Sequence, residues 1–179
     1  MKLPFFTIGH STRTIEAFVH LLRAAEVSLV VDIRSIPRSR TNPQFNQDTL
    51  PATLAAFNTD YIHLPELGGL RHTSKTVAEG TNGLWENASF HNYADYALTR
   101  EFKDGLDKLI ALGRKQRCAI MCSEAVWWRC HRRIVADYLL AHDEQVFHLM
   151  NTDKVVPASF TKGALVKDSL ITYPADDTN

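Results

Sequence analysis

The residues with the greatest chemical potential in this chain lie close together, between Met121 and Arg133. This segment contains two thiols, a carboxylate, two indoles, an imidazole and three guanidinium groups. The apolar run 117–121 predicts a short buried strand, and the apolar spacing over 129–141 predicts a helix. Cys122 is therefore expected at the carboxyl end of a strand, where open α/β sheets bind ligands.

A nucleophilic or redox-active thiol is one interpretation of Cys122. A helix N-terminus and nearby arginines would lower the pKa of this thiol and increase the fraction of thiolate. The alternative is a small buried residue that only packs, as free cysteines often do. Cys118 lies inside the expected strand and fits the packing interpretation.

Three further residues are predicted to move protons or to orient the reacting groups. Glu124 is a candidate acid or base, or an acceptor for an amine or a guanidinium group. His10 follows the first expected strand and can exchange a proton near neutral pH. Asp32 follows the second expected strand and is predicted to orient a partner. A capping or structural role is the alternative for these side chains.

Positive charge near these residues favours an anionic ligand, such as a phosphate-bearing nucleotide or nucleic acid. Ordinary ion pairs with carboxylates are the alternative for the arginines. The two tryptophans are candidates for stacking on a base, and core packing is their alternative. The residues predicted to bind substrate are Ser11, Arg34, Arg38, His63, Trp127, Trp128, Arg129, His131 and Arg132.

A metal site is a third interpretation of the cysteine segment. Cys122, Cys130 and His131 offer sulfur and imidazole ligands that suit zinc or iron. The chain lacks the closely spaced cysteine pairs of zinc ribbons, so we expect no metal. The loop 9–13 after the first strand lacks the three-glycine dinucleotide fingerprint, and no cofactor is expected.

Strands and helices alternate along the chain, which predicts an α/β fold. The β-branched run 29–33 is typical of a strand that is covered on both faces of a parallel sheet. Because right-handed crossovers place helices on both faces, we expect a three-layer Rossmann-like fold. The other strands are expected at residues 5–9, 60–64, 117–121 and 145–150. Helices are expected from Thr14, over 48–57, over about 93–110 with a possible break near Thr99, and over 129–141.

Length and composition predict a single domain over residues 1–179, with a glycine-containing loop or lid at about 65–89 and a weakly patterned tail at about 151–179. Lysine plus arginine equal aspartate plus glutamate at 20 each, so no overall charge draws the chain to nucleic acid or to a membrane. No membrane-spanning run or secretory signal is found, and three cysteines fit a reducing compartment. A cytoplasmic location is expected, and the sequence does not indicate an oligomeric state.

Several motifs along the chain, taken together, resemble one known family. They are Thr7–Ser11, Val31–Ser35, Pro37–Ser39, His63–Gly69, Met121–Glu124 and Cys130–Arg132. In this order they resemble the domain of unknown function family 488 over nearly the whole chain. The resemblance implies a single-domain Rossmann-like protein with these motifs at the carboxyl edge of its sheet, and it implies no reaction. Family tails often carry a histidine after the proline that matches Pro157, where this chain has Ala158.

These features predict an intracellular enzyme, a cysteine- or carboxylate-dependent hydrolase or transferase. Its substrate would be anionic, nucleotide-like or part of a nucleic acid, bound at Cys122 and Glu124 beneath the segment 65–89. The first competing hypothesis is a nucleic-acid-binding module without turnover. The second is a metal-binding protein.

Overall fold

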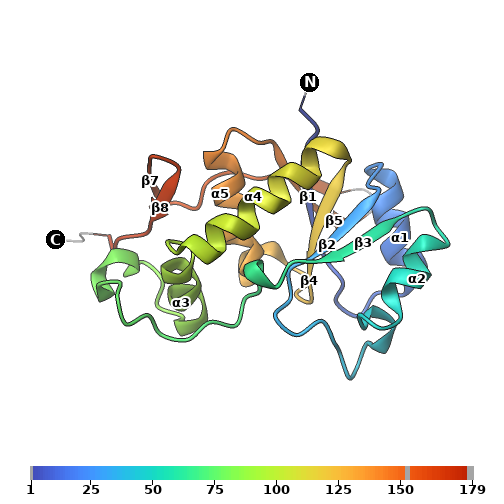
Figure 1. Cartoon of the computed structure of the whole chain (residues 1–179), viewed down its shortest axis with the longest axis horizontal. Helices are drawn as coiled ribbons and strands as arrows, with labels where there is room; N and C mark the ends of the chain where they lie inside the picture. Colours follow the sequence, from blue (N-terminus) through green and yellow to red (C-terminus); the bar gives the residue numbers. More distant parts are fainter. Residues whose placement is uncertain (1, 152–153, 177–179) are drawn as a thin grey trace.

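Six strands form one central sheet in the computed structural model, which describes residues 2–151 and 154–176 (Figure 1). The strands are β1 (Phe5–Gly9), β2 (Leu29–Asp32), β3 (Asp60–His63), β4 (Cys118–Cys122), β5 (Val146–Asn151) and β6 (Lys154–Pro157). Their order is β3-β2-β4-β1-β5-β6. The first five strands in this order are parallel to their neighbours, and β6 runs antiparallel to β5 at the edge.

Helices cover both faces of this sheet, which confirms the predicted three-layer Rossmann-like fold (Figure 1). One face packs against α1 (Ile15–Ala24) and α2 (Leu50–Ala55). The other face packs against α3 (Ala88–Tyr96), α4 (Arg100–Lys115) and α5 (Arg132–Ala141). A small hairpin of β7 (Leu165–Lys167) and β8 (Leu170–Thr172) joins the second layer through buried Ile171.

Local signals explain where the helices begin. The Thr14 hydroxyl accepts a hydrogen bond from the Ala17 amide at 3.1 Å, which caps α1. Thr99 caps α4 in the same way through the Phe102 amide, so the expected helix over about 93–110 is two helices broken at Thr99. Pro51 lies in the first turn of α2, where its missing N–H costs little.

The pleat of the strands decides which layer each side chain enters. Along β4, Cys118 and Ile120 belong to the core beneath α4 and α5, whereas Ala119 and Met121 belong to the core beneath α1 and α2. Because side chains alternate with a period of two, Cys122 is on the α5 side of the sheet. Functional groups at neighbouring strand ends are therefore separated by face as well as by distance.

The structure corrects the helix that was expected over 129–141. A short 3₁₀ turn occupies Trp127–Arg129, and α5 begins only at Arg132. The reason is the extended backbone of Cys130, with φ −129° and ψ 148°, which a continuous helix cannot contain.

The tail contains more regular structure than its weak sequence pattern indicated, namely β6 and the β7–β8 hairpin. Residues 152–153 and 177–179 of this tail lie outside the described residues. Within residues 2–151 and 154–176, no helix combines the length and apolar character needed to cross a membrane.

Candidate functional site

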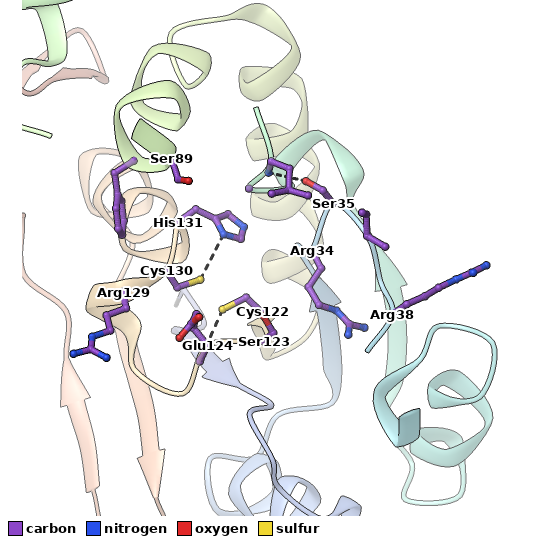
Figure 2. A pocket seen from close by; sticks show the side chains of 14 residues that line it. Arg34, Ser35, Arg38, Ser89, Cys122, Ser123, Glu124, Arg129, Cys130 and His131 are labelled. Atoms are coloured by element: carbon purple, nitrogen blue, oxygen red, sulfur yellow. Dashed lines mark hydrogen bonds between the residues drawn. The ribbon is translucent and has the colours of Figure 1, made fainter. Parts of the chain in front are cut away.

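A pocket with a volume of about 290 Å³ opens at the carboxyl end of β4, between the end of β2 and the start of α5 (Figure 2). The strand register aligns this edge, because Gly9 is opposite Cys122 and Asp32 is opposite Met121. From β4 the chain continues to α5 on one face of the sheet, and from the neighbouring β2 it continues to α2 on the other face. The pocket lies between these two strand ends, which is where open α/β sheets bind ligands. Its lining includes Arg34, Ser35, Ile36, Arg38, Gly69, Leu70, Ser89, Phe90, Cys122, Ser123, Glu124, Arg129, Cys130 and His131.

The end of β1 holds the loop that follows Cys122. The His10 amide donates to the Cys122 carbonyl at 2.9 Å, and the Ser11 amide donates to the Ser123 carbonyl at 3.0 Å. Gly9 approaches so closely that a Cβ atom there would lie 1.7 Å from the Glu124 carbonyl oxygen. Only glycine permits this contact between two backbone segments.

Two thiols meet in the pocket. Cys122, from the end of β4, and Cys130, from just before α5, are both free and buried, and their sulfur atoms face each other (Figure 2). Burial alone would raise the pKa of Cys122, but the hydrogen bond from the Cys130 thiol and the charge of Arg132 outweigh it, so this pKa lies below its ordinary value. Burial and the neighbouring Cys122 sulfur raise the pKa of Cys130 well above its ordinary value. The two thiols therefore titrate as a coupled pair, in which Cys122 loses its proton more readily than Cys130.

A buried guanidinium group favours the charged form of Cys122. Arg132 is only 1% exposed, and its Nη2 donates to the carbonyls of Glu124 and Ala125 at 3.0 Å and 3.2 Å. Its Nε and Nη1 atoms have no hydrogen-bond partner among the described residues. None of the ion pairs formed within this part of the chain includes Arg132. Because a buried cation is stabilised by a nearby anion, the charge of Arg132 favours ionisation of the Cys122 thiol.

His131 extends the sulfur pair as a neutral imidazole. Its Nε2 lies 2.8 Å from the Ile33 carbonyl, which can only accept, so Nε2 carries the proton. Nδ1 is then an acceptor, and it lies 3.5 Å from the Cys130 sulfur. Burial lowers the pKa of His131 to about 4, which keeps the ring uncharged at neutral pH. The helix amide of Arg132 donates to the Cys130 sulfur at 3.4 Å, so the start of α5 acts on Cys130 rather than on Cys122.

The glycine pair after β3 closes one side of the pocket. A Cβ atom at Gly69 would lie 2.5 Å from Nδ1 of His131, and one at Gly68 would lie 2.4 Å from the Ser35 hydroxyl. The Ser35 hydroxyl accepts a hydrogen bond from the Leu70 amide at 2.9 Å, which anchors this loop to the segment after β2 (Figure 2). Gly69 lets the loop lie directly on the imidazole, and Gly68 lets it lie directly on Ser35.

Asp32 and His10 belong to a separate network on the α1 and α2 side of the sheet. The Asp32 carboxylate accepts from Nε of Arg34 at 2.9 Å, from Nη2 of Arg34 at 2.7 Å and from the Tyr61 hydroxyl at 2.5 Å. His10 lies 3.3 Å from Arg34 through Nε2 and stacks on Phe45 at 4.5 Å. Burial and the Arg34 charge lower the pKa of His10. Arg34 links this network to the pocket that it lines.

The structure brings together six of the predicted site residues in the pocket lining and leaves seven outside it. The six are Arg34, Arg38, Cys122, Glu124, Arg129 and His131. The seven are His10, Ser11, Asp32, His63, Trp127, Trp128 and Arg132.

His63 and the two tryptophans are among the seven residues that lie outside the pocket lining. His63 donates to the Arg34 carbonyl at 2.7 Å. The Trp127 ring stacks on His148 at 4.5 Å, so that one of its faces is already covered, whereas Trp128 is 45% exposed.

Sequence reasoning missed the second thiol as a direct partner of the first. Cys130 was considered only as a metal ligand, together with Cys122 and His131. Ser35, Leu70 and Phe90 were also missed, although Ser35 and the glycine pair stood in the motifs quoted above. Among the described residues, no group of three His, Cys, Asp or Glu side chains is arranged to hold a metal ion.

An open, mostly parallel sheet with a two-thiol pocket at its carboxyl edge defines a Rossmann-like α/β protein. The family model described as "Domain of unknown function DUF488" matches residues 14–139, and the chain belongs to this family. The match is shorter than the resemblance over nearly the whole chain, since the Thr7–Ser11 motif and the tail lie outside it. No curated protein and no solved structure matches the chain.

Proposed function

We propose that the protein is an enzyme that acts on an anionic substrate through the thiolate of Cys122. The observation that carries this proposal is Arg132, a buried cation without a carboxylate partner in the described structure, next to a thiol that opens into a pocket. A thiolate, not a thiol, is the nucleophilic form of cysteine. Burying an uncompensated guanidinium group is costly, and a thiolate-bearing site gives this arrangement a chemical use.

The pocket lining supports an anionic ligand with an apolar part. Arg38 and Arg129 lie on opposite sides of the pocket, and neither side chain forms an ion pair within the described residues (Figure 2). Both guanidinium groups point away from the pocket in Figure 2, so each exposed side chain would have to change rotamer to bind a carboxylate or phosphate group there. Ile36 and Leu70 are 61% and 68% exposed beside them, which offers apolar surface to the rest of the ligand. A nucleotide-like molecule has both of these features.

Each of the other candidate residues then has a role that follows from its place. Glu124 lines the pocket beside Cys122 and would carry protons to or from the substrate. Asp32 and His10 would position Arg34 rather than touch the substrate, because both contact its guanidinium group from the far face of the sheet. The segment 65–89 would cover the ligand through Gly69, Leu70 and Ser89.

The test compares alkylation of each cysteine by iodoacetate, which is anionic, and by iodoacetamide, which is neutral, over a range of pH with peptide-resolved mass spectrometry. We expect Cys122 to react with a midpoint below the ~8.5 of a free thiol. The ratio of the iodoacetate rate to the iodoacetamide rate should be higher for Cys122 than for glutathione. Arg129→Gln or added salt should lower this ratio. Cys118 is an internal control, because burial raises its pKa to about 12. A Cys122 that reacts no faster than Cys118 would rule out the proposal.

A nucleic-acid-binding module is the second candidate, and the exposed Trp128 next to Arg129 favours it. Stacking on a base would then occur at Trp128, since Trp127 already stacks on His148. An oligonucleotide that binds with a steep salt dependence, and equally well to the Cys122→Ser variant, would support this module instead of an enzyme.

A further inference from the structure

The proposed function uses one thiol, although the pocket contains two. Cys122 and Cys130 come from different elements, and both of their sulfur atoms line the same cavity (Figure 2). The extended backbone at Cys130 and its position just before α5 direct its side chain at Cys122. A nucleophilic thiol can work without a second thiol beside it, so the pair requires an explanation of its own.

The two sulfur atoms differ in a way that suits a sequential reaction. The charge of Arg132 acts on both thiols, but the pKa of Cys122 is lowered whereas that of Cys130 is raised, so the Cys122 sulfur would attack first. Cys130 keeps its proton and faces Nδ1 of His131, an acceptor at 3.5 Å. The Arg132 amide already donates to the Cys130 sulfur at 3.4 Å, and it would stabilise negative charge that develops there when the proton leaves. Cys130 is therefore arranged to react second.

We propose that Cys122 and Cys130 act together as a dithiol that reduces small anionic disulfides, with Cys122 as the attacking sulfur and Cys130 as the resolving sulfur. This inference rests on the proposed function and names its substrate class. The Cys122 thiolate attacks one sulfur of the disulfide R–S–S–R, forms a mixed disulfide and releases R–S⁻. Cys130 then transfers its proton to the released thiolate, attacks the Cys122 sulfur and displaces the second R–S⁻.

The balance of this sequence is a two-electron exchange. The substrate disulfide is reduced to one thiol and one thiolate, and the protein dithiol is oxidised to a Cys122–Cys130 disulfide. An external dithiol reductant must reduce that disulfide before the next turnover. Arg38 and Arg129 would select anionic disulfides, while Phe90 and Leu70 would contact their apolar parts.

The probe for this reaction is dithiobis(nitrobenzoate), an anionic aromatic disulfide that releases a coloured thiolate. We expect the wild-type protein to release two coloured thiolates per chain and to retain no adduct, with the second release independent of reagent concentration. Peptide mapping should then find Cys122 linked to Cys130. Cys130→Ser should release one thiolate and keep the aromatic group on Cys122. Cys118→Ala is the matched control, because Cys118 lies in the core away from the pocket, and it should behave as the wild type.

Substrate charge is tested with cystamine, a cationic disulfide, and both rates are normalised to the reaction with glutathione. We expect cystamine to react at least about tenfold more slowly at low salt, as steering by like charges predicts. A wild-type protein that keeps the aromatic adduct on Cys122 while Cys130 stays free would overturn the inference and leave the proposed function standing. Equal rates for both probes would overturn the anionic substrate class. A Cys122 that reacts with neither probe would overturn both the proposed function and the dithiol reaction. This result differs from the other two, in which Cys122 does react.

Discussion

At the scale of single residues, Arg132 lowers the pKa of Cys122 although it does not line the pocket. The largest of the fully buried side chains is this guanidinium group, and two of its nitrogen atoms lack a protein acceptor in the described part of the chain. Replacing a buried ion by an apolar side chain of similar volume is often tolerated by a fold. The charge of Arg132 can therefore be removed while the packing of α5 is largely preserved.

Arg132→Met should raise the pKa of Cys122, because the stabilising cation is lost while the thiol stays buried. A rise of one pH unit corresponds to about tenfold less thiolate, so alkylation of Cys122 at pH 7 should slow by about that factor. The measurement is the midpoint of the alkylation rate against pH.

Arg133→Met is the matched control for this experiment. Arg133 is the next residue of the same helix, but its Nε donates to the Thr161 hydroxyl at 3.1 Å and its guanidinium group lies over Trp85. This variant loses the same charge and should leave the Cys122 midpoint where it is. If Arg132→Met leaves the midpoint of Cys122 alkylation unchanged, the charge of Arg132 does not lower the pKa of Cys122, and the hydrogen bond from Cys130 is the remaining cause.

The sequence could predict part of this residue-level arrangement. Cys122 and Glu124 were placed correctly at the strand end, since a short apolar run followed by polar residues marks such an end. Arg132 was predicted to hold the substrate, yet it is buried beneath the loop it supports. Whether an arginine near a helix start points inward depends on the residue at which the helix begins, and the sequence pattern placed that start too early.

At the scale of elements, strand alternation explains why the candidates divide into two groups. Val30 belongs to the α1 and α2 core, so Asp32 two residues later is on that side, whereas Cys122 is on the α5 side. This division could be derived from the sequence once the strands were known. The extended backbone at Cys130 could not, because the apolar spacing over 129–141 also fits a continuous helix.

The loop after β3 restricts substitution near the pocket through its close contact with His131. Gly69→Ala should destabilise the protein by roughly 1–3 kcal/mol, because the added methyl group would press on the His131 ring, which a hydrogen bond to Ile33 holds in place. Gly80→Ala, in the same long segment, has no atom within 4 Å of the added Cβ and should be close to neutral. Urea denaturation of both variants makes the comparison. Equal stability of the two would show that the loop yields at Gly69 and does not pack rigidly on the imidazole.

At the scale of the whole molecule, the alternation of strands and helices was sufficient to predict the three layers. The tail strands β6, β7 and β8 were not predicted, because they are short and mostly exposed, so they lack an alternating apolar pattern. The layered fold also buries several imidazoles as neutral rings. Burial lowers the pKa of His131 to about 4 and that of His148 to about 3, and it lowers the pKa of His10 as well.

These depressed pKa values predict a stability that falls with acid. Below pH 6.5 the unfolded chain binds protons on His131 and His148 and the folded chain does not, so the free energy of unfolding falls as the pH falls toward about 4. Each such histidine contributes a slope of about 1.4 kcal/mol per pH unit within this window. Carboxylates also titrate there, but their contribution is common to the wild type and a histidine variant and cancels in the difference.

His148→Gln therefore tests whether one buried imidazole stays neutral. The informative quantity is the slope of the free energy of unfolding against pH, and not its value at any one pH. His148 bonds to the Thr7 hydroxyl at 2.6 Å and stacks on Trp127, so the variant should be less stable at every pH. Between pH 6 and pH 4.5, its free energy of unfolding should change less steeply than that of the wild type, by about 1.4 kcal/mol per pH unit. His20→Gln, a surface substitution on α1, should keep the wild-type slope. If His148→Gln also keeps the wild-type slope, the folded protein accommodates a charged His148. The stack of Trp127 on His148 would then not depend on a neutral imidazole.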